Sequence, residues 1–399
     1  MSSSENGSRN RAEAVVPGAE TIRSDARTVL VVDDSAFMRK LVSEVVASTG
    51  EFRVIGTARD GHDALRQVKA LSPDLITLDV DMPGLDGLVA LELIMRDHPR
   101  AVVMLSAGGS DGGVDATLRA LERGAVDFVR KPSGAISLDL ELVAGPLLQA
   151  LRAATGVAVA EHPVLAAGRV PVARRVVAPA VPLHGPPARV VCVAASTGGP
   201  AAIAQLLPAL PAWDDAAVLI VQHMPVGFTG SFARRLDGTC ALTVHEAAHG
   251  EPLRAGHAYV APGGLHLMLS GSREAPLLAL HDGPPLHGVR PAADPLFTSA
   301  AALFGADCLA VVLTGMGRDG ADGAHAIRTA GGRAIVQDVA SSIVPGMPEA
   351  ARQRAGADRV VPLDGMADAI VGMVAAMGDP RDARPERSGY DTPALQRSA

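Results

Sequence analysis

One pattern recurs along most of the sequence: a short apolar run ends at a polar or charged residue and is followed by a stretch with helical spacing. The first example is residues 29–32, which end at Asp33 and are followed by Phe37, Leu41 and Val45. Short apolar runs predict buried strands, and apolar side chains three or four residues apart predict helices. Strands that alternate with helices favour a parallel sheet covered by helices, so the chain is predicted to be an α/β protein.

The pattern occurs in two blocks, which predicts two doubly wound, mostly parallel α/β domains. The first block has apolar runs at residues 29–32, 53–58, 75–78, 102–105 and 126–129. The second has them at residues 190–193, 218–221, 242–245, 257–260, 309–313 and 333–336. Apolar residues make up 48% of the chain and aromatic residues only 3%, so both cores must consist of Ala, Val, Leu and Ile. Such a composition suits parallel sheets that are buried on both faces.

Composition outside these blocks sets the expected domain limits. Residues 1–26 and 379–399 are polar and aperiodic, which predicts a disordered tail at each end. The two domains are expected at residues 27–145 and 188–378. Between them, residues 146–187 are rich in Ala, Val, Pro and Gly and predict a linker, although residues 140–154 also fit a helix that continues the first domain.

Charge and cysteine usage exclude several classes of protein. The formal net charge is −7, so bulk electrostatic binding to nucleic acid or to an anionic membrane is not expected. The three cysteines, Cys192, Cys240 and Cys308, have no CxxC spacing and predict reduced thiols. The polar N-terminus has no apolar signal core, and no run is apolar enough to cross a bilayer. A cytoplasmic protein without direct membrane insertion is therefore predicted.

An acidic cluster is expected in the first domain, because the carboxyl ends of parallel strands meet in one crevice. That crevice collects Asp33, Asp34, Asp79, Ser106 and Lys131. Crowded carboxylates are tolerated when a hard cation such as Mg²⁺ lies among them. A carboxylate beside that cation can attack a phosphoryl group, while a lysine and a hydroxyl stabilise the transferred charge. The alternative is an α/β domain whose loops are merely acidic.

The first domain resembles the receiver domains of response regulators between about residues 28 and 132. The resemblance rests on residues 31–35, on residues 78–87 and on the Lys131-Pro132 pair. It implies a flavodoxin-like parallel five-stranded sheet, Asp79 as phospho-acceptor and a histidine kinase of the chemotaxis type as donor. It also implies Mg²⁺ bound by Asp34, Asp79 and the Asp81 backbone carbonyl, with Asp33 in support. Ser106 and Phe128 fall at the family's hydroxyl and aromatic switch positions.

The second domain has Ser196, His223 and Asp319 at predicted strand ends. Ser196 lies in an A-x-S-x-G turn that opens a helix, and the helical N–H groups favour a developing oxyanion there. His223 could accept the serine proton, and Asp319 could orient the imidazole. Each residue also has a simpler interpretation, as a helix cap, a loop histidine and a turn residue. The order Ser, His, Asp differs from that of α/β-hydrolases.

Residues 195–200, 222–224, 261–266 and 314–320 resemble the catalytic domain of chemotaxis protein-glutamate methylesterases of the CheB type. The resemblance implies Ser196 as nucleophile, His223 as base and Asp319 as orienting acid, without a cofactor in the esterase site. It implies demethylation of receptor glutamates, and in many members deamidation of receptor glutamines, on methyl-accepting chemotaxis receptors. One departure is the Ala292-Ala293 pair before Asp294, where a Ser-Val pair is expected; it should leave the triad untouched. The N–H groups of Thr197 or near Met316 are candidate oxyanion donors.

Two rival functions remain to be weighed. Residues 245–249 match the zinc-protease pattern H-E-x-x-H, which needs both histidines on one helical face. The apolar residues before His245 favour a strand, and Gly250 and Pro252 would interrupt a helix, so a strand and turn are predicted instead. The other rival is a receiver with a DNA-binding output, which the acidic balance and the α/β pattern of the second block disfavour.

Overall fold

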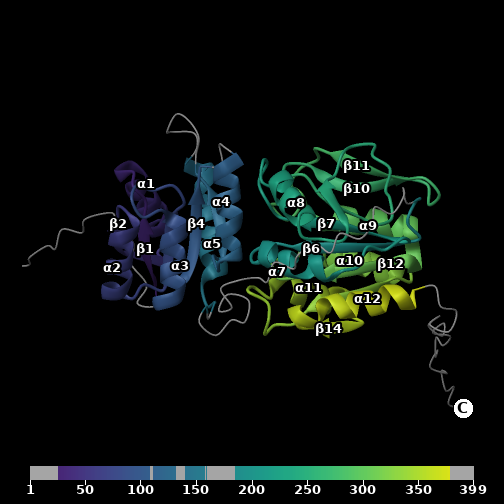
Figure 1. Cartoon of the computed structure of the whole chain (residues 1–399). Coiled ribbons are helices and arrows are strands. Elements are labelled where there is room, and N and C mark those ends of the chain that lie inside the picture. The colour runs from purple at the N-terminus through teal and green to yellow at the C-terminus, as the bar shows by residue number, and fades with distance from the viewer. Residues whose placement is uncertain (1–25, 108–110, 132–139, 158, 160–184, 378–399) are drawn as a thin grey trace, which may run out of the picture.

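The computed structural model describes residues 26–107, 111–131, 140–157, 159 and 185–377. These residues form two α/β domains that lie side by side (Figure 1). The predicted tails, apart from Ala26, and most of the predicted linker lie outside the described residues. In the part of the chain that is described, no helix is both long and apolar enough to span a bilayer.

The N-terminal domain contains the predicted five-stranded sheet, and every strand pair in it is parallel. The strand order is β2-β1-β3-β4-β5, so the connection direction reverses between β1 and β3. Ligands bind at such a reversal, outside the carboxyl ends of the strands. The strands are β1 (Arg27–Val32), β2 (Phe52–Ala58), β3 (Leu75–Asp79), β4 (Ala101–Ser106) and β5 (Asp127–Arg130).

Helices cover both faces of this sheet because its strand residues are apolar on both sides. The helices are α1 (Ala36–Ala47), α2 (Gly61–Leu71), α3 (Gly87–Asp97), α4 (Asp111–Glu122) and α5 (Leu140–Ala154). Ser35, Asp60 and Asp86 cap the first three through their side-chain oxygens, as their residue types favour. Helix α5 is the helix expected over residues 140–154, and it packs on the N-terminal sheet through Leu147 and Leu151. The expected linker start at residue 146 therefore falls inside a helix.

The C-terminal domain contains a seven-stranded sheet in the order β14-β13-β12-β6-β7-β9-β8, again with only parallel pairs. Six of its strands are the predicted ones: β6 (Arg189–Ala195), β7 (Ala216–Gln222), β8 (Thr243–Glu246), β9 (His257–Val260), β12 (Cys308–Val312) and β13 (Arg333–Gln337). The connection direction reverses at β6, whose neighbours are β7 and β12. The crevice of this domain therefore lies at the carboxyl ends of these three strands.

Three strands were missed by the sequence patterns. Strand β14 (Arg359–Val361) is a short, mostly exposed edge strand. Strands β10 (His266–Gly271) and β11 (Pro276–His281) form an antiparallel hairpin apart from the main sheet. The helices of the domain are α7 (Gly199–Leu206), α8 (Thr229–Asp237), α9 (Ala293–Phe304), α10 (Ala321–Thr329), α11 (Gly346–Ala355) and α12 (Met366–Ala376).

The two domains meet where α4 faces α7 and α8 (Figure 1), and residues of β5 also contact the C-terminal domain. Arg235 of α8 donates to both carboxylate oxygens of Glu122 on α4, at 2.5 Å each, and to Asp115 Oδ1 at 3.0 Å. Phe128 of β5 packs against Phe228, with ring centroids 4.6 Å apart. The interface thus includes both a charged fork and an aromatic pair.

Candidate functional site

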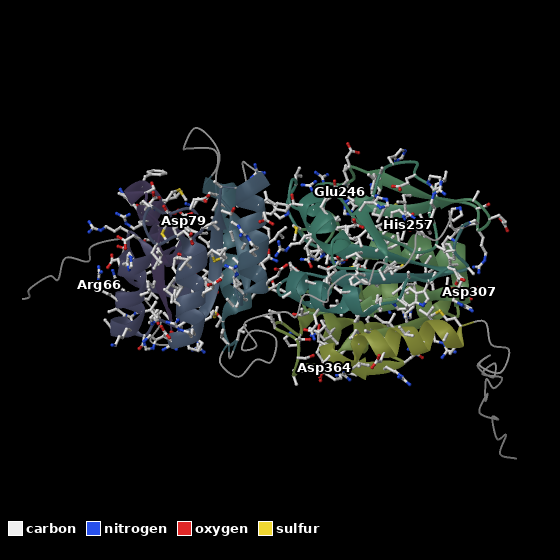
Figure 2. All side chains as sticks on the ribbon, viewed as in Figure 1. Arg66, Asp79, Glu246, His257, Asp307 and Asp364 are labelled. Atoms are coloured by element: carbon white, nitrogen blue, oxygen red, sulfur yellow. The ribbon has the colours of Figure 1, made fainter. Side chains whose placement is uncertain are left out.

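The acidic residues of the N-terminal domain do converge at its sheet reversal. Lys131 Nζ lies 2.7 Å from Asp33 Oδ2 and 2.7 Å from Asp79 Oδ1. Oxygen atoms of Asp33, Asp34 and Asp79 lie within 4.8 Å of one another. Oxygen ligands gathered in this way suit a hard divalent cation, so the residues present fit Mg²⁺. Figure 2 labels Asp79 within this domain.

Asp79 is almost fully buried at the end of β3, and its environment changes its acidity. Burial, opposed by the hydrogen bond and charge of Lys131, raises the pKa of Asp79 to about 6, and the nearby Asp33 carboxylate adds to the rise. A carboxylate with a raised pKa is more basic, and therefore a better nucleophile, than an ordinary aspartate. A nearby cation favours its ionised form.

The loop after β3 approaches Asp79 so closely that only glycine fits at residue 87. A Cβ atom on Gly87 would lie 1.9 Å from the carbonyl oxygen of Asp79. Ser106 is fully buried at the end of β4, where its hydroxyl accepts a 2.7 Å hydrogen bond from Thr117. Phe128, grouped with the switch residues by resemblance, contacts Phe228 of the other domain. Phe128 therefore lies at the domain interface, whereas the Ser106 hydroxyl contacts α4 of its own domain.

Ser196 follows β6 directly and is held by backbone contacts on both sides. Its N–H donates to the Thr314 carbonyl at 3.0 Å, and its carbonyl accepts from Gln222 Nε2 at 3.0 Å. The N-cap of α7 is Gly198, with φ 76°, so Ser196 is not a helix cap. A Cβ on Gly315 would lie 2.7 Å from the Ser196 Cβ, which shows how tightly the neighbouring loop packs against it.

His223 and Asp319 are brought together from strands on either side of β6. His223 follows β7, and its Nε2 lies 2.7 Å from Asp319 Oδ2 in the loop after β12. Their side chains are 10% and 2% exposed. Among the described residues, no hydrogen bond joins the Ser196 hydroxyl to His223, although the His223 N–H donates to the carbonyl of the adjacent Ala195 at 3.0 Å. Because Nε2 faces Asp319, Nδ1 is the ring nitrogen left for Ser196.

Asp319 is further held by the first N–H groups of α9. Ala293 N–H donates to Oδ2 at 2.6 Å, and Asp294 N–H donates to Oδ1 at 3.1 Å. Burial opposes ionisation, but the His223 hydrogen bond and charge, with these two N–H groups, keep the pKa of Asp319 below its ordinary value. The segment that departs from the expected pattern therefore does contact Asp319. It does so through its backbone, so the Ala side chains do not disturb the contact.

Two N–H groups near Ser196 are free to stabilise an oxyanion. Neither Thr197 nor Met316 donates a backbone hydrogen bond within the described part of the chain. The Thr197 carbonyl instead accepts from the Thr314 hydroxyl at 3.0 Å, which fixes the turn after Ser196. Both candidate donors named from the sequence thus remain open.

The H-E-x-x-H segment is a strand and turn, as predicted. His245 and Glu246 belong to β8, and His249 follows it. His245 Nε2 lies 2.7 Å from Glu251 Oε1, and His249 Nδ1 accepts from the Leu280 N–H at 3.0 Å. Glu246 accepts from Thr229. Figure 2 labels Glu246 and His257 in this part of the molecule. The residues of the pattern point to different partners, so they do not form a zinc site.

The N-terminal domain reaches the Ser196 region. Asp127 Oδ2 of β5 accepts a 2.5 Å hydrogen bond from the hydroxyl of Thr197. Burial raises the pKa of Asp127, against the opposing effect of the Thr197 hydrogen bond. A pocket of about 520 Å³ lies between α5 and the loops that carry the histidine–aspartate pair, and its lining includes Pro146, Gln149, His223, Met316 and Asp319.

Sequence reasoning missed the residues that support the site from a distance. Asp127, Arg235 and Asp294 were not singled out, and their partners are far away in the chain. Of the three, only Asp294 lies in a segment that the sequence patterns singled out, and there the departure concerned the preceding Ala292-Ala293 pair. Periodicity and strand ends predict which residues gather at a crevice, but not which side chains cross between helices or domains.

The fold and the two sites define a class of protein: a phosphorylation-type receiver domain joined to an α/β hydrolase domain. Residues 29–142 match the family described as response regulator receiver domain, and residues 191–370 match the family described as CheB methylesterase.

Relatives that match most of this chain and most of their own length identify the family. A protein-glutamate methylesterase/protein-glutamine glutaminase of Pyrococcus horikoshii is 43% identical over 86% of this chain and 92% of that protein. One of Symbiobacterium thermophilum is 45% identical over 86% and 95%. The crystal structure of the Thermotoga maritima CheB methylesterase catalytic domain is 38% identical and covers 47% of this chain and 98% of that one, with a TM-score of 0.46. The chain belongs to the protein-glutamate methylesterase/protein-glutamine glutaminase family and is a carboxylic ester hydrolase.

Proposed function

We propose that this enzyme removes methyl groups from glutamate methyl esters of methyl-accepting chemotaxis receptors, and deamidates receptor glutamines, through Ser196, His223 and Asp319. The observation that carries the proposal is the 2.7 Å contact between His223 and Asp319 beside the strand end that holds Ser196. The names of the relatives supply the substrate class. Reversible methylation of receptors would make the enzyme part of sensory adaptation.

The first half of the reaction forms a covalent intermediate. Ser196 Oγ attacks the ester carbonyl while His223 takes its proton, and Asp319 stabilises the imidazolium. The N–H groups of Thr197 and Met316 can receive the developing oxyanion, because both lack another backbone acceptor in the described residues. His223 then protonates the leaving group, and methanol departs.

The second half releases the receptor carboxylate. A water molecule, deprotonated by His223, attacks the glutamyl-serine ester, and the proton returns to Ser196 Oγ. With a glutamine substrate, ammonia leaves in place of methanol and the same acyl intermediate follows. The lowered pKa of Asp319 keeps its carboxylate ionised throughout the working range of an imidazole base.

Regulation would come from phosphorylation of Asp79 by a histidine kinase of the chemotaxis type. Asp33, Asp34, Asp79 and the backbone carbonyl of Asp81 would hold Mg²⁺, which neutralises charge on the transferred phosphoryl group. Lys131, whose Nζ lies 2.7 Å from Asp79 Oδ1, and the buried Ser106 would engage that group afterwards. The Phe128–Phe228 and Asp127–Thr197 contacts support an inhibitory role of the resting receiver, since they cover the side of the domain that carries Ser196.

Because its proposed substrates are the cytoplasmic helices of receptors, we propose a cytoplasmic enzyme that does not insert into the membrane and has no nucleic-acid partner. The functional test is the initial rate of methanol release from methylated receptor, with and without a small phosphoryl donor and Mg²⁺. A rate that rises with the donor supports the proposal. If the protein does not act on the receptor and instead retards DNA in a salt-dependent binding assay, the DNA-binding alternative would be revived.

Replacement of Asp79 should reveal the free-energy cost of burying its ionised carboxylate. Its pKa of about 6 lies above the ordinary value of 3.8, so the folded state disfavours the ionised form and loses stability as the pH rises from about 4 to 6. At pH 7.5 without Mg²⁺, Asp79→Asn should stabilise the receiver by about 1 to 2 kcal/mol. The difference should shrink at pH 5 or when Mg²⁺ is added to the wild type.

The measurement is urea unfolding of the full chain, following the transition that responds to Mg²⁺. Asp81→Asn is the matched control, because it changes an exposed carboxylate two residues away and should have little effect. If Asp79→Asn is less stable than wild type at pH 7.5, the conclusion that the folded state disfavours the ionised Asp79 carboxylate is wrong.

Zinc should play no part in ester hydrolysis. His249→Ala removes only an acceptor for the Leu280 N–H, so methanol release should stay within about twofold of wild type. A zinc-selective chelator should likewise have no effect on the phosphorylated full chain. Stoichiometric zinc that leaves together with the activity would reverse this conclusion.

A further inference from the structure

Helices α9 and α10 begin beside each other, and each receives a cap from the carboxylate of the other's N-terminal region. Asp319, just before α10, accepts the N–H groups of Ala293 and Asp294 in α9. Asp294 Oδ1 in turn accepts the Gly323 N–H of α10 at 2.7 Å. Neither helix has a side-chain cap from its own N-cap residue. The exchange satisfies N–H groups that lack helical partners and places two carboxylates side by side.

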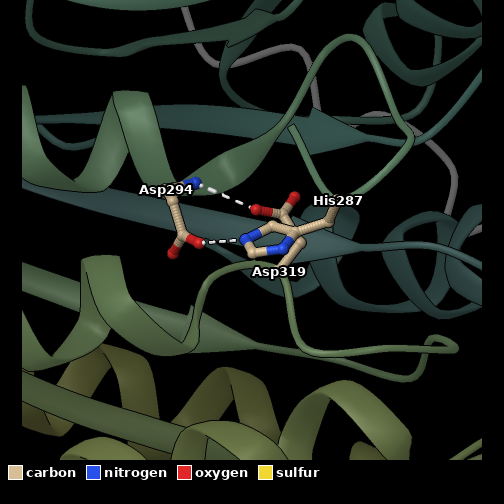
Figure 3. A group of neighbouring side chains, drawn as sticks. All are labelled: His287, Asp294 and Asp319. Carbon is tan, nitrogen blue, oxygen red and sulfur yellow. Dashed lines mark hydrogen bonds and ion pairs between the residues drawn. The ribbon is translucent and has the colours of Figure 1, made fainter. Parts of the chain in front are cut away.

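Each of these carboxylates also carries an imidazole. His223 contacts Asp319, and His287 Nε2 lies 2.8 Å from Asp294 Oδ2 (Figure 3). One nitrogen of His287 and carboxylate oxygens of Asp294 and Asp319 lie within 4.8 Å of one another. These oxygens already accept N–H groups, so the cluster fits a hydrogen-bonded network rather than a metal site. Both histidines line the same 520 Å³ pocket.

His287 is presented by a turn that favours other residues. His287 and Gly288 have φ of 54° and 78°, between Leu286 and Val289, which exchange backbone hydrogen bonds of 3.1 and 3.0 Å. A two-residue turn with positive φ at both central positions favours Asn-Gly. The turn backbone is exposed, yet the imidazole is only 19% exposed and bonded to Asp294. A histidine kept in this sparsely populated conformation suggests a task for its ring.

We propose that His287 is a positioning residue for ester hydrolysis: through Asp294 it holds the paired helix starts that orient Asp319 towards His223. The proposal rests on the function proposed above. Burial and the adjacent Asp319 charge both raise the pKa of Asp294, while the hydrogen bond and charge of His287 oppose that rise. Without the imidazole, a buried carboxylate would lose one of its two partners, and the pair of helix starts would lose a restraint.

Several charged groups surround His287. Asp294 faces it from α9, Asp319 and Arg318 from the loop before α10, Asp322 from α10, His223 from the loop after β7 and Arg152 from α5 across the pocket. Asp294 is the group that the imidazole contacts directly, and the N–H of Asp294 in turn holds Asp319. Loss of the imidazole therefore acts on Asp319 through Asp294.

His287→Asn tests the positioning role of the imidazole without disturbing the turn. Asparagine suits positive φ, but its side chain is too short to replace the imidazole at Asp294. The control is His245→Asn, which breaks a similar imidazole–carboxylate pair, His245–Glu251 at 2.7 Å, on the edge strand β8. Both variants are made in the full chain and activated with a phosphoryl donor and Mg²⁺. Methanol release from methylated receptor is measured across pH, with thermal unfolding of each protein.

We expect His287→Asn to lower kcat about tenfold at the pH optimum, with KM changed by less than about twofold. His245→Asn should keep the wild-type kcat and KM. If His287→Asn matches His245→Asn, the proposal is wrong. It is also wrong if KM rises together with the fall in kcat, since that marks a general disturbance of the pocket rather than a misplaced Asp319. Failure of the proposed function is recognised separately, by Ser196→Ala that still releases methanol.

Discussion

Ser196→Ala should lose nearly all methanol release from methylated receptor, by about 10⁴-fold or more, as in other serine triads. Ser196 is the nucleophile proposed above, and it lies directly after β6, beside the loop that carries Asp319. The fold should be unaffected, because the contacts of Ser196 that hold the turn are made by its backbone. Initial rates of the phosphorylated full chain measure the effect.

The matched control is Ser270→Ala, which removes an exposed hydroxyl on β10. It should keep the wild-type rate and the wild-type unfolding temperature. Near-normal methanol release from Ser196→Ala, with the fold intact, would refute Ser196 as the nucleophile. The His223–Asp319 pair would then need another partner in the same crevice.

Opening the domain interface should raise the basal rate of the unphosphorylated enzyme by about tenfold, because the resting receiver is proposed to inhibit it. The bidentate arginine–carboxylate fork is the contact to break, since such forks are among the stronger polar contacts. Arg235→Glu replaces that fork with repulsion against Glu122 and Asp115. The receiver should then spend less time against the Thr197 and Phe228 surfaces. The rate on methylated receptor without a phosphoryl donor is the measurement.

The control for this prediction is the restored pair. Arg235→Glu combined with Glu122→Arg should return the basal rate towards wild type, since one ion pair is rebuilt in reverse. A fragment that begins near Ala188 should be at least as active as Arg235→Glu, and Asp79→Asn should stay at the basal rate when the donor is added. If the fragment is no faster than the unphosphorylated full chain, inhibition by the receiver is wrong, and phosphorylation must act by stimulation or targeting.

Much of the fold follows from local patterns in the sequence. The eleven predicted strands are all present, because each is an apolar run whose ends are marked by polar or turn-forming residues. Strand β14 escaped detection because it is three residues long and exposed, so burial leaves no pattern in it. The β10–β11 hairpin was missed because the prediction relied on strands that alternate with helices, as in a parallel sheet. Two antiparallel strands joined by a short turn do not show that alternation.

The sequence by itself determined which residues meet at each crevice, because side chains that follow parallel strands must converge at one edge of the sheet. Asp33, Asp79 and Lys131 meet for that reason, and so do His223 and Asp319. Only the tertiary structure decided the contacts that cross between helices and domains: Asp294 with Gly323, His287 with Asp294, and Arg235 with Glu122. These depend on how packed elements are oriented, and that orientation comes from the fit of whole surfaces, which no short stretch of sequence encodes.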